Sequence, residues 1–135
     1  MAADLDMYAM AVDAAARAED EDGLSRYLSL AEGAAQRADH KLYIAVARRA
    51  RGVAHRLAGE WDLAAGPLKA ATDEFRALDT KWQIGRTLLE LGEVERGREN
   101  SGVSMEHFAE ALSAFETLGA DPDAHLARAA LESLS

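Results

Sequence analysis

The sequence predicts an all-α protein, built from antiparallel helix hairpins that stack as a short right-handed solenoid. Two observations support this prediction. Alanine is the commonest residue, followed by leucine, arginine and glutamate, which are strong helix formers, while proline occurs only at Pro67 and Pro122. No segment alternates apolar and polar residues with a period of two, as a half-buried strand would. We therefore expect about seven helices and no strand.

The first four helices are separated by polar turns and by one glycine. An acidic run that begins at Glu19 separates the first helix from the second, and Asp39 with His40 separates the second from the third. Gly59 follows the third helix, where a glycine in the left-handed conformation commonly ends a helix. Apolar residues at intervals of three and four predict one buried face for each segment. The four helices span about residues 4–19, 24–38, 41–58 and 60–78.

The last three helices follow the same pattern. Asp79 and Thr80 turn the chain before the fifth helix, and Asn100 begins an Asn-Ser-Gly loop signal before the sixth. Pro122 lies in the first turn of the last helix, where proline is tolerated. These helices span about residues 81–98, 103–118 and 122–134.

The sequence also matches itself at an offset of 40 positions, which is the length of one helix hairpin. The matching pairs are Gly52 with Gly92, Leu68 with Phe108, Ala71 with Ala111, Phe75 with Phe115, and Leu78 with Leu118. The first hairpin matches less well, because Ala35 aligns with Phe75. We predict a single domain over residues 1–135, with repeats at about 4–39, 41–79 and 81–119 and a capping helix at about 122–134.

The segment from Gly52 to Ala71 resembles a tetratricopeptide repeat. The matching residues are Gly52, Gly59, Glu60, Trp61, Ala64, Leu68 and Ala71, and part of the pattern recurs at Gly92, Phe108 and Ala111. The longer period is similar to the helical-repeat region at the C-terminal side of large bacterial LuxR-type regulators and of related ATPase–cyclase signalling proteins. This resemblance implies a protein-binding or regulatory repeat domain.

Two of the departures from the repeat pattern are arginines of the third helix. Arg48 and Arg51 stand where repeats of this kind usually have apolar packing residues, and where the next repeat has Leu88 and Leu91. The departure puts the packing of the third helix in question, although the repeat itself remains recognisable.

The composition excludes several classes of function. The 135 residues include 24 acidic and 15 basic ones, and a net charge of −9 argues against binding to nucleic acid or to an anionic membrane. The absence of cysteine excludes thiolate chemistry, and no phosphate loop, nucleophile elbow or paired histidines at metal-binding spacing occur. We therefore expect a cytoplasmic protein that is not an enzyme and binds no metal or cofactor.

The third helix has an unusual charge, because it carries several basic residues and no acid. In stacked hairpins the first helix of each pair lines a concave groove, and guanidinium groups bind carboxylates well. We therefore predict a protein–protein interaction module whose partly basic groove binds an acidic peptide or a partner helix. The predicted groove residues are Arg49, Arg56, Trp82, Arg86, Leu89 and Arg96.

Three alternatives remain open. The arginines could pair with Glu90, Glu93 or other acids of neighbouring helices and only stabilise the fold. The chain could be a sensory or regulatory repeat domain of a transcription or signalling regulator. It could also form a structural homodimer, because Met7 and Met10 lie opposite the apolar stripe of the first helix and methionine surfaces adapt to partners.

Overall fold

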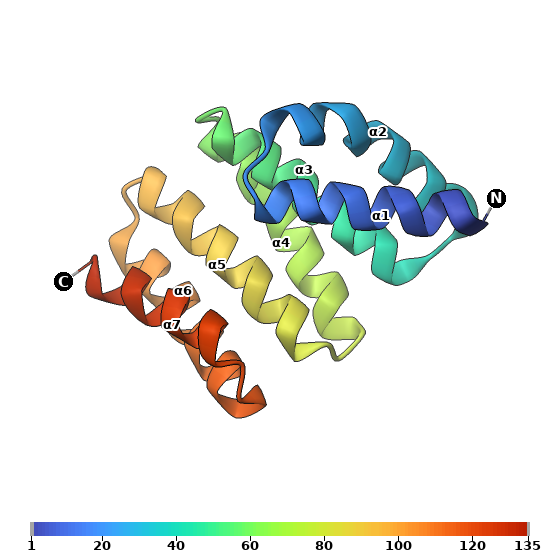
Figure 1. Cartoon of the computed structure of the whole chain (residues 1–135). Coiled ribbons are helices and arrows are strands. Elements are labelled where there is room, and N and C mark those ends of the chain that lie inside the picture. Colours follow the sequence, from blue (N-terminus) through green and yellow to red (C-terminus); the bar gives the residue numbers. More distant parts are fainter. Residues whose placement is uncertain (1, 135) are drawn as a thin grey trace.

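Seven α-helices form the part of the chain that the structure, a computed structural model, describes, namely residues 2–134. They are α1 (Ala2–Arg17), α2 (Glu21–Ala38), α3 (Lys41–Leu57), α4 (Trp61–Ala77), α5 (Lys81–Gly97), α6 (Ser101–Leu118) and α7 (Asp121–Glu132). The helices follow one another along the molecule, so that the two termini lie at opposite ends (Figure 1). The all-α prediction is confirmed, and the described residues contain no strand.

Each helix packs mainly on its neighbours in the sequence. α3 contacts both α2 and α4, α5 contacts both α4 and α6, and α7 packs on α6. The odd-numbered helices also meet, since α3 contacts α1 on one side and α5 on the other. This order of contacts is that of hairpins stacked into a solenoid, in which each unit contacts only its neighbours.

The turns between helices are built alike and recur every 20 residues. Each turn contains one residue with a left-handed backbone, and these residues are Glu19, Asp39, Gly59, Asp79, Glu99 and Gly119. The next residue flanks the new helix; Asp20 and His40, for example, accept hydrogen bonds from the backbone N–H groups of Gly23 and Tyr43. The predicted loop at Asn100–Gly102 is therefore too long, because α6 already begins at Ser101.

The core lies between the stacked helices and depends on close approach. Phe108 is fully buried against α5 at Gly92, where a Cβ atom would lie only 2.3 Å from its ring. Leu68 of α4 packs in the same way on Gly52 of α3, with 2.4 Å to such a Cβ atom. Glycine is thus required at these two positions for the helices to meet. None of the helices α1 to α7 is long and apolar enough to cross a membrane.

Candidate functional site

The predicted groove residues lie on α3 and α5, and ion pairs join these helices to α1. Asp13 of α1 contacts both Arg49 of α3 and Arg86 of α5, each at 3.0 Å. Arg56 of α3 contacts Glu19, in the turn after α1, at 3.1 Å. We call the surface formed by α1, α3, α5 and α7 around these pairs the inner face.

Arg49, one of the residues predicted to line the groove, is buried in the structure. Its side chain is 1% exposed, and its guanidinium donates hydrogen bonds to Asp13, to Gln83 Oε1 at 2.7 Å and to Thr87 Oγ1 at 3.3 Å. The group also lies over the ring of Phe75. Burial, reinforced by the charge of Arg86, lowers the pKa of Arg49 to about 10. Arg49 therefore holds helices together.

Arg56 is also mostly buried, and its guanidinium contacts acids of the same chain. Only 12% of its side chain is exposed, and its Nε lies 2.7 Å from Glu90 on α5. Burial raises the pKa of Glu90, and the attraction of Arg56 opposes this rise. The pair therefore braces α3 against α5 with both groups mostly out of solvent.

Trp82 and Arg86 form a second brace, at the other end of the inner face. Arg86 is 11% exposed, binds Asp13 and lies over the Trp82 ring, 5.0 Å from its centroid. Arg17 of α1 lies over the same ring, at 5.5 Å. The indole N–H of Trp82 donates a hydrogen bond to Asp123 of α7 at 2.9 Å. These contacts connect α1, α5 and α7.

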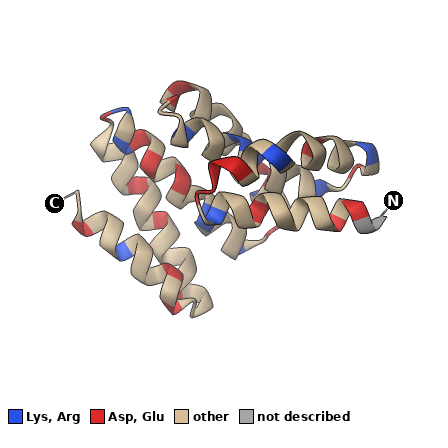
Figure 2. Cartoon of the chain, turned by 45° about the horizontal axis from the view of Figure 1, so that its top comes forward, with Lys and Arg blue, Asp and Glu red and all other residues tan. Residues whose placement is uncertain are grey.

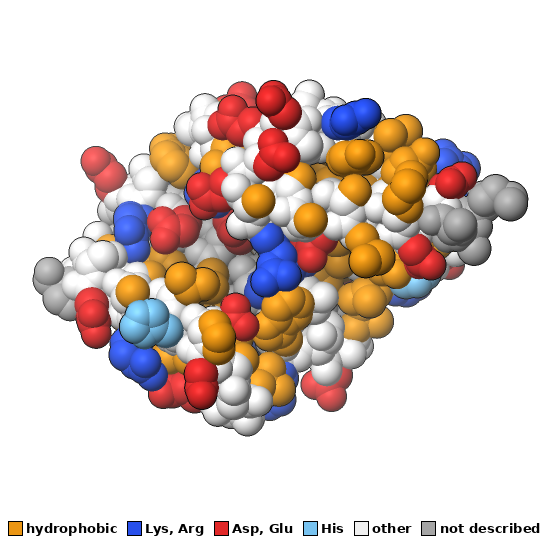
Figure 3. Space-filling view, in the orientation of Figure 1, with side chains coloured by type: hydrophobic (Ala, Val, Ile, Leu, Met, Phe, Trp, Pro, Cys, Tyr) orange, Lys and Arg blue, Asp and Glu red, His pale blue; other side chains and the backbone are white. Residues whose placement is uncertain are grey.

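The remaining predicted residues are more accessible. Leu89 and Arg96 of α5 are half-buried, and Arg96 lies 3.7 Å from Glu93. Viewed from this side, the surface is hollowed between the α1–α2 turn and α5, with acidic side chains around the hollow (Figure 3). Acidic residues also gather at the α1–α2 turn (Figure 2).

The charges of the inner face balance. Four of its arginines contact a carboxylate, namely Arg49, Arg56, Arg86 and Arg96 with Asp13, Glu19, Glu90 or Glu93. The fifth, Arg17, lies over the ring of Trp82, whose indole N–H donates to Asp123. These contacts agree with one alternative given in the sequence analysis, in which the arginines pair with acids of neighbouring helices. The inner face therefore offers no surplus of positive charge to an acidic ligand.

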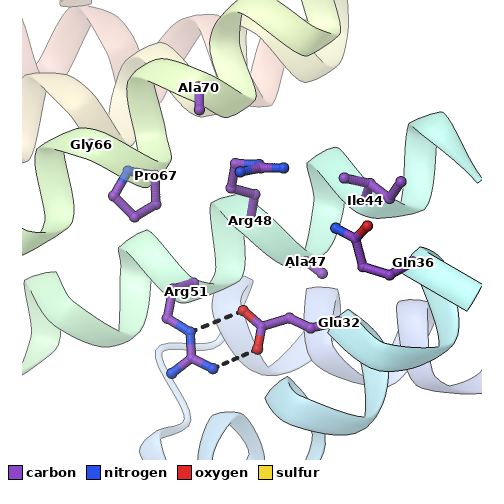
Figure 4. A pocket seen from close by; sticks show the side chains of 9 residues that line it. All are labelled: Glu32, Gln36, Ile44, Ala47, Arg48, Arg51, Gly66, Pro67 and Ala70. Carbon is purple, nitrogen blue, oxygen red and sulfur yellow. Dashed lines mark hydrogen bonds and ion pairs between the residues drawn. The ribbon is translucent and has the colours of Figure 1, made fainter. Parts of the chain in front are cut away.

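A different surface offers more open space, and we call it the α3 groove. Two hollows, of about 340 and 460 Å³, lie along α3 between α2 and α4, and a third, of about 350 Å³, lies between α2 and the C-terminal part of α3. The central hollow has α3 as its floor, with Gln36 and Glu32 on the α2 side and Gly66, Pro67 and Ala70 on the α4 side (Figure 4).

Two arginines project from the floor of the α3 groove. Arg51 forms a two-point ion pair with Glu32 of α2, through Nε at 3.0 Å and through Nη2. Arg48 contacts Glu74 of α4 through Nε at 2.9 Å and is 39% exposed. Each arginine thus ties α3 to one wall and keeps part of its guanidinium at the open surface.

The repeat pattern explains why this groove is open. Arg48 and Arg51 occupy the positions of Leu88 and Leu91, which are buried at the following junction. Ala35 stands where the following repeat has the fully buried Phe75. α2 packs less closely on α3 than α4 does on α5. These departures were the sequence signal for the groove, although the groove itself was not predicted.

The residues predicted for self-association are exposed, as that prediction requires. Met7 is 51% and Met10 is 69% exposed on α1. A hollow between α1 and α2 is lined by Leu5, Tyr8 and Leu30. Hydrophobic side chains gather over α1 and α2 in Figure 3.

The chain matches no protein-family model, no curated protein and no solved structure. The resemblance to tetratricopeptide repeats and to the repeat regions of LuxR-type regulators therefore stays a prediction from the sequence. The α3 groove and the inner face are the two surfaces from which a function can be argued.

Proposed function

We propose that this chain is a protein–protein interaction module that binds a segment of a partner protein in the α3 groove. The observation that carries the proposal is the row of three hollows along α3 from Ile44 to Ala58, two of them between α2 and α4 and the third between α2 and α3. Grooves between helices are common binding places for amphipathic helices, which dock their apolar face.

The chemistry of the groove supports a protein ligand. Its walls combine apolar groups, such as Pro67, Ala70 and Leu78, with charged and amide groups at defined positions. Such a mixture suits a peptide, whose side chains are both apolar and polar. The inner face is a less favourable place for the same function, because Arg49, Arg56 and Arg86 are at most 12% exposed. The two arginines of the α3 groove are 39% and 37% exposed.

Self-association is a second candidate function, favoured by the exposure of Met7 and Met10. A dimer formed through α1 would bury this apolar surface. Molar mass measured by light scattering over a wide concentration range tests it, with Met7→Glu as the variant that should remove any dimer. A regulatory role inside a larger protein is compatible with either mode of binding.

Site-specific photo-crosslinking in the native host tests the main proposal. A benzophenone amino acid replaces Ala70 in the α3 groove, Leu89 on the inner face or the exposed Ala109 on α6. We expect a distinct partner protein to be crosslinked at position 70 and not at position 109. The same proteins at every position, or none at position 70, would contradict the proposal.

Two glycines provide a matched pair of variants for this experiment. Apart from its chain neighbours, a Cβ atom at Gly66 or at Gly102 would meet nothing within 4 Å, so a leucine at either position avoids the core. Because Gly66 precedes Pro67, the helicity of Gly66→Leu is first verified by circular dichroism. Only Gly66 lines the groove. Gly66→Leu should abolish the crosslink at position 70, and Gly102→Leu should leave it unchanged.

A further inference from the structure

We infer that α1 is a reversible lid over the inner face, and that its undocking uncovers a basic surface formed by Arg49 of α3 and Arg86 of α5. The inference goes beyond the proposed function, because it concerns the inner face and not the α3 groove. It follows from the small apolar contact that holds α1, from the polar contacts that hold it instead, and from the position of the carboxylate that neutralises the two arginines.

The apolar side of α1 consists mainly of small side chains. Among the residues that the structure describes, those buried in α1 are Ala9, Val12, Ala15 and Ala16. The buried apolar side chains of α5, in contrast, are Ile84, Leu88, Leu91 and Val94. Because the stabilisation from burial grows with the apolar area removed from water, an alanine contributes little to the docking of a helix. α1 also belongs to the first hairpin of the stack, so only one neighbouring hairpin covers it (Figure 1).

Polar side chains hold α1 in place instead. Asp13 contacts Arg49 and Arg86 at 3.0 Å each. Asp6 accepts a hydrogen bond from the Tyr43 hydroxyl at 2.8 Å. When a helix undocks, such groups become hydrated, which offsets part of the cost of breaking the contacts. The Nε atom of Arg49 is buried and has no hydrogen-bond partner among the described residues, so undocking would also let water reach this atom.

The lid carries the carboxylate that neutralises the inner face. Asp13 is the only carboxylate that contacts Arg49 or Arg86 among the residues that the structure describes. The other hydrogen-bond partners of Arg49 are neutral groups of α5. When α1 leaves, Asp13 leaves with it, and both arginines lose their carboxylate, whereas Arg56 keeps its contact with Glu90 of α5. The opened inner face therefore presents two positive charges that the closed molecule neutralises.

Labelling of the full chain with two independent probes tests the inference. Hydrogen exchange followed by mass spectrometry measures the opening constant of α1, which is the ratio of open to closed molecules. Phenylglyoxal, which reacts with accessible guanidinium groups, measures the uncovering of Arg49, whose side chain is 1% exposed. We expect both probes to give the same opening constant, at least about tenfold larger than that of the α6 amides. α6 carries the fully buried Phe108 and Phe115 and is the reference for global unfolding, and the exposed Arg128 is the reference for reagent activity.

Two matched substitutions separate opening of the lid from general destabilisation. Asp13→Asn removes the charge that α1 brings to the inner face, whereas Asp123→Asn removes a carboxylate that contacts Trp82 from α7. We expect Asp13→Asn to raise the opening constant of α1 and the labelling of Arg49 by about tenfold, and Asp123→Asn to leave both unchanged.

Two results would overturn the inference. Labelling of Arg49 at the level set by the α6 amides would mean that this side chain becomes accessible only when the whole chain unfolds. An equal effect of Asp13→Asn and Asp123→Asn on the opening of α1 would mean that Asp13 does not hold the lid.

Discussion

Asp13 on α1 accepts two hydrogen bonds from Arg86 on α5, at 3.0 and 3.1 Å, although 73 positions separate the two residues in the sequence. The same carboxylate accepts a hydrogen bond from the buried Arg49 of α3 at 3.0 Å. One side chain therefore joins three helices and compensates two positive charges. Because one of these charges is fully enclosed, the fold depends on Asp13 more than its partial exposure suggests.

Replacing Asp13 with alanine should lower the free energy of unfolding by about 3 kcal/mol, since it leaves the buried guanidinium of Arg49 without its carboxylate. Urea denaturation measures this change from the shift of the midpoint. Asp4→Ala, at an exposed position of the same helix, is the control and should cost about 0.5 kcal/mol. Equal effects of the two substitutions would show that the three-helix brace contributes nothing.

Two glycines in helix interiors should respond to alanine with opposite signs. At Gly92 the added methyl group would overlap the Phe108 ring, so Gly92→Ala should destabilise the chain by about 2 kcal/mol. At Gly33 the added group meets only the flexible end of the Arg37 side chain, so Gly33→Ala should stabilise it by about 1 kcal/mol through helix propensity. Thermal melts of both variants measure the change in the midpoint temperature of unfolding. A change in the same direction for both variants would refute the packing described for Gly92.

The order of the helices could be predicted because the turns are encoded locally. Gly59 was expected to end a helix and does so in the left-handed conformation, and the turn at Asp39 and His40 is where the polar pair predicted it. Gly102 misled the prediction, because a glycine in the first turn of a helix resembles a loop residue in the sequence. Local signals thus located each turn to within about three residues, the largest difference being at the start of α2, which begins at Glu21.

The candidate site could be predicted only in part, because it depends on contacts between distant helices. The charge pattern identified the arginines of α3, but a helical wheel treats one helix alone and leaves Arg49 on the open face. In the structure α1 and α5 cover Arg49, through contacts 34 to 38 positions away. By contrast, the departures at Arg48 and Arg51 were visible against Leu88 and Leu91, and they mark the α3 groove.

The left-handed turn residues give a further prediction. Glu99 has a φ of 64°, a conformation that costs a residue with a side chain about 1 kcal/mol and costs glycine little. Glu99→Gly should therefore raise the free energy of unfolding by about 0.5 kcal/mol, after the greater entropy of glycine in the unfolded chain is subtracted. The reverse change at the equivalent turn, Gly119→Ala, should lower it by about 1 kcal/mol. Chemical denaturation of the two variants measures both changes in the free energy of unfolding. Stabilisation by Gly119→Ala would contradict the left-handed backbone conformation of Gly119.

The buried carboxyl of Glu90 should give the chain a characteristic dependence on pH. Burial raises its pKa above the ordinary value of 4.5, so the folded state holds this proton more tightly than the unfolded state does. The stability that this protonated carboxyl contributes is fully present below pH 4.5 and is lost as the pH rises through the folded-state pKa.

Glu90→Gln keeps the shape of the neutral form and cannot ionise. The free energy of unfolding of the variant, relative to that of the parent, should therefore increase between pH 4 and pH 7, which urea denaturation at each pH measures. A constant difference over this range would mean that the charge of Glu90 costs nothing in the fold, and that Arg56 fully compensates its burial.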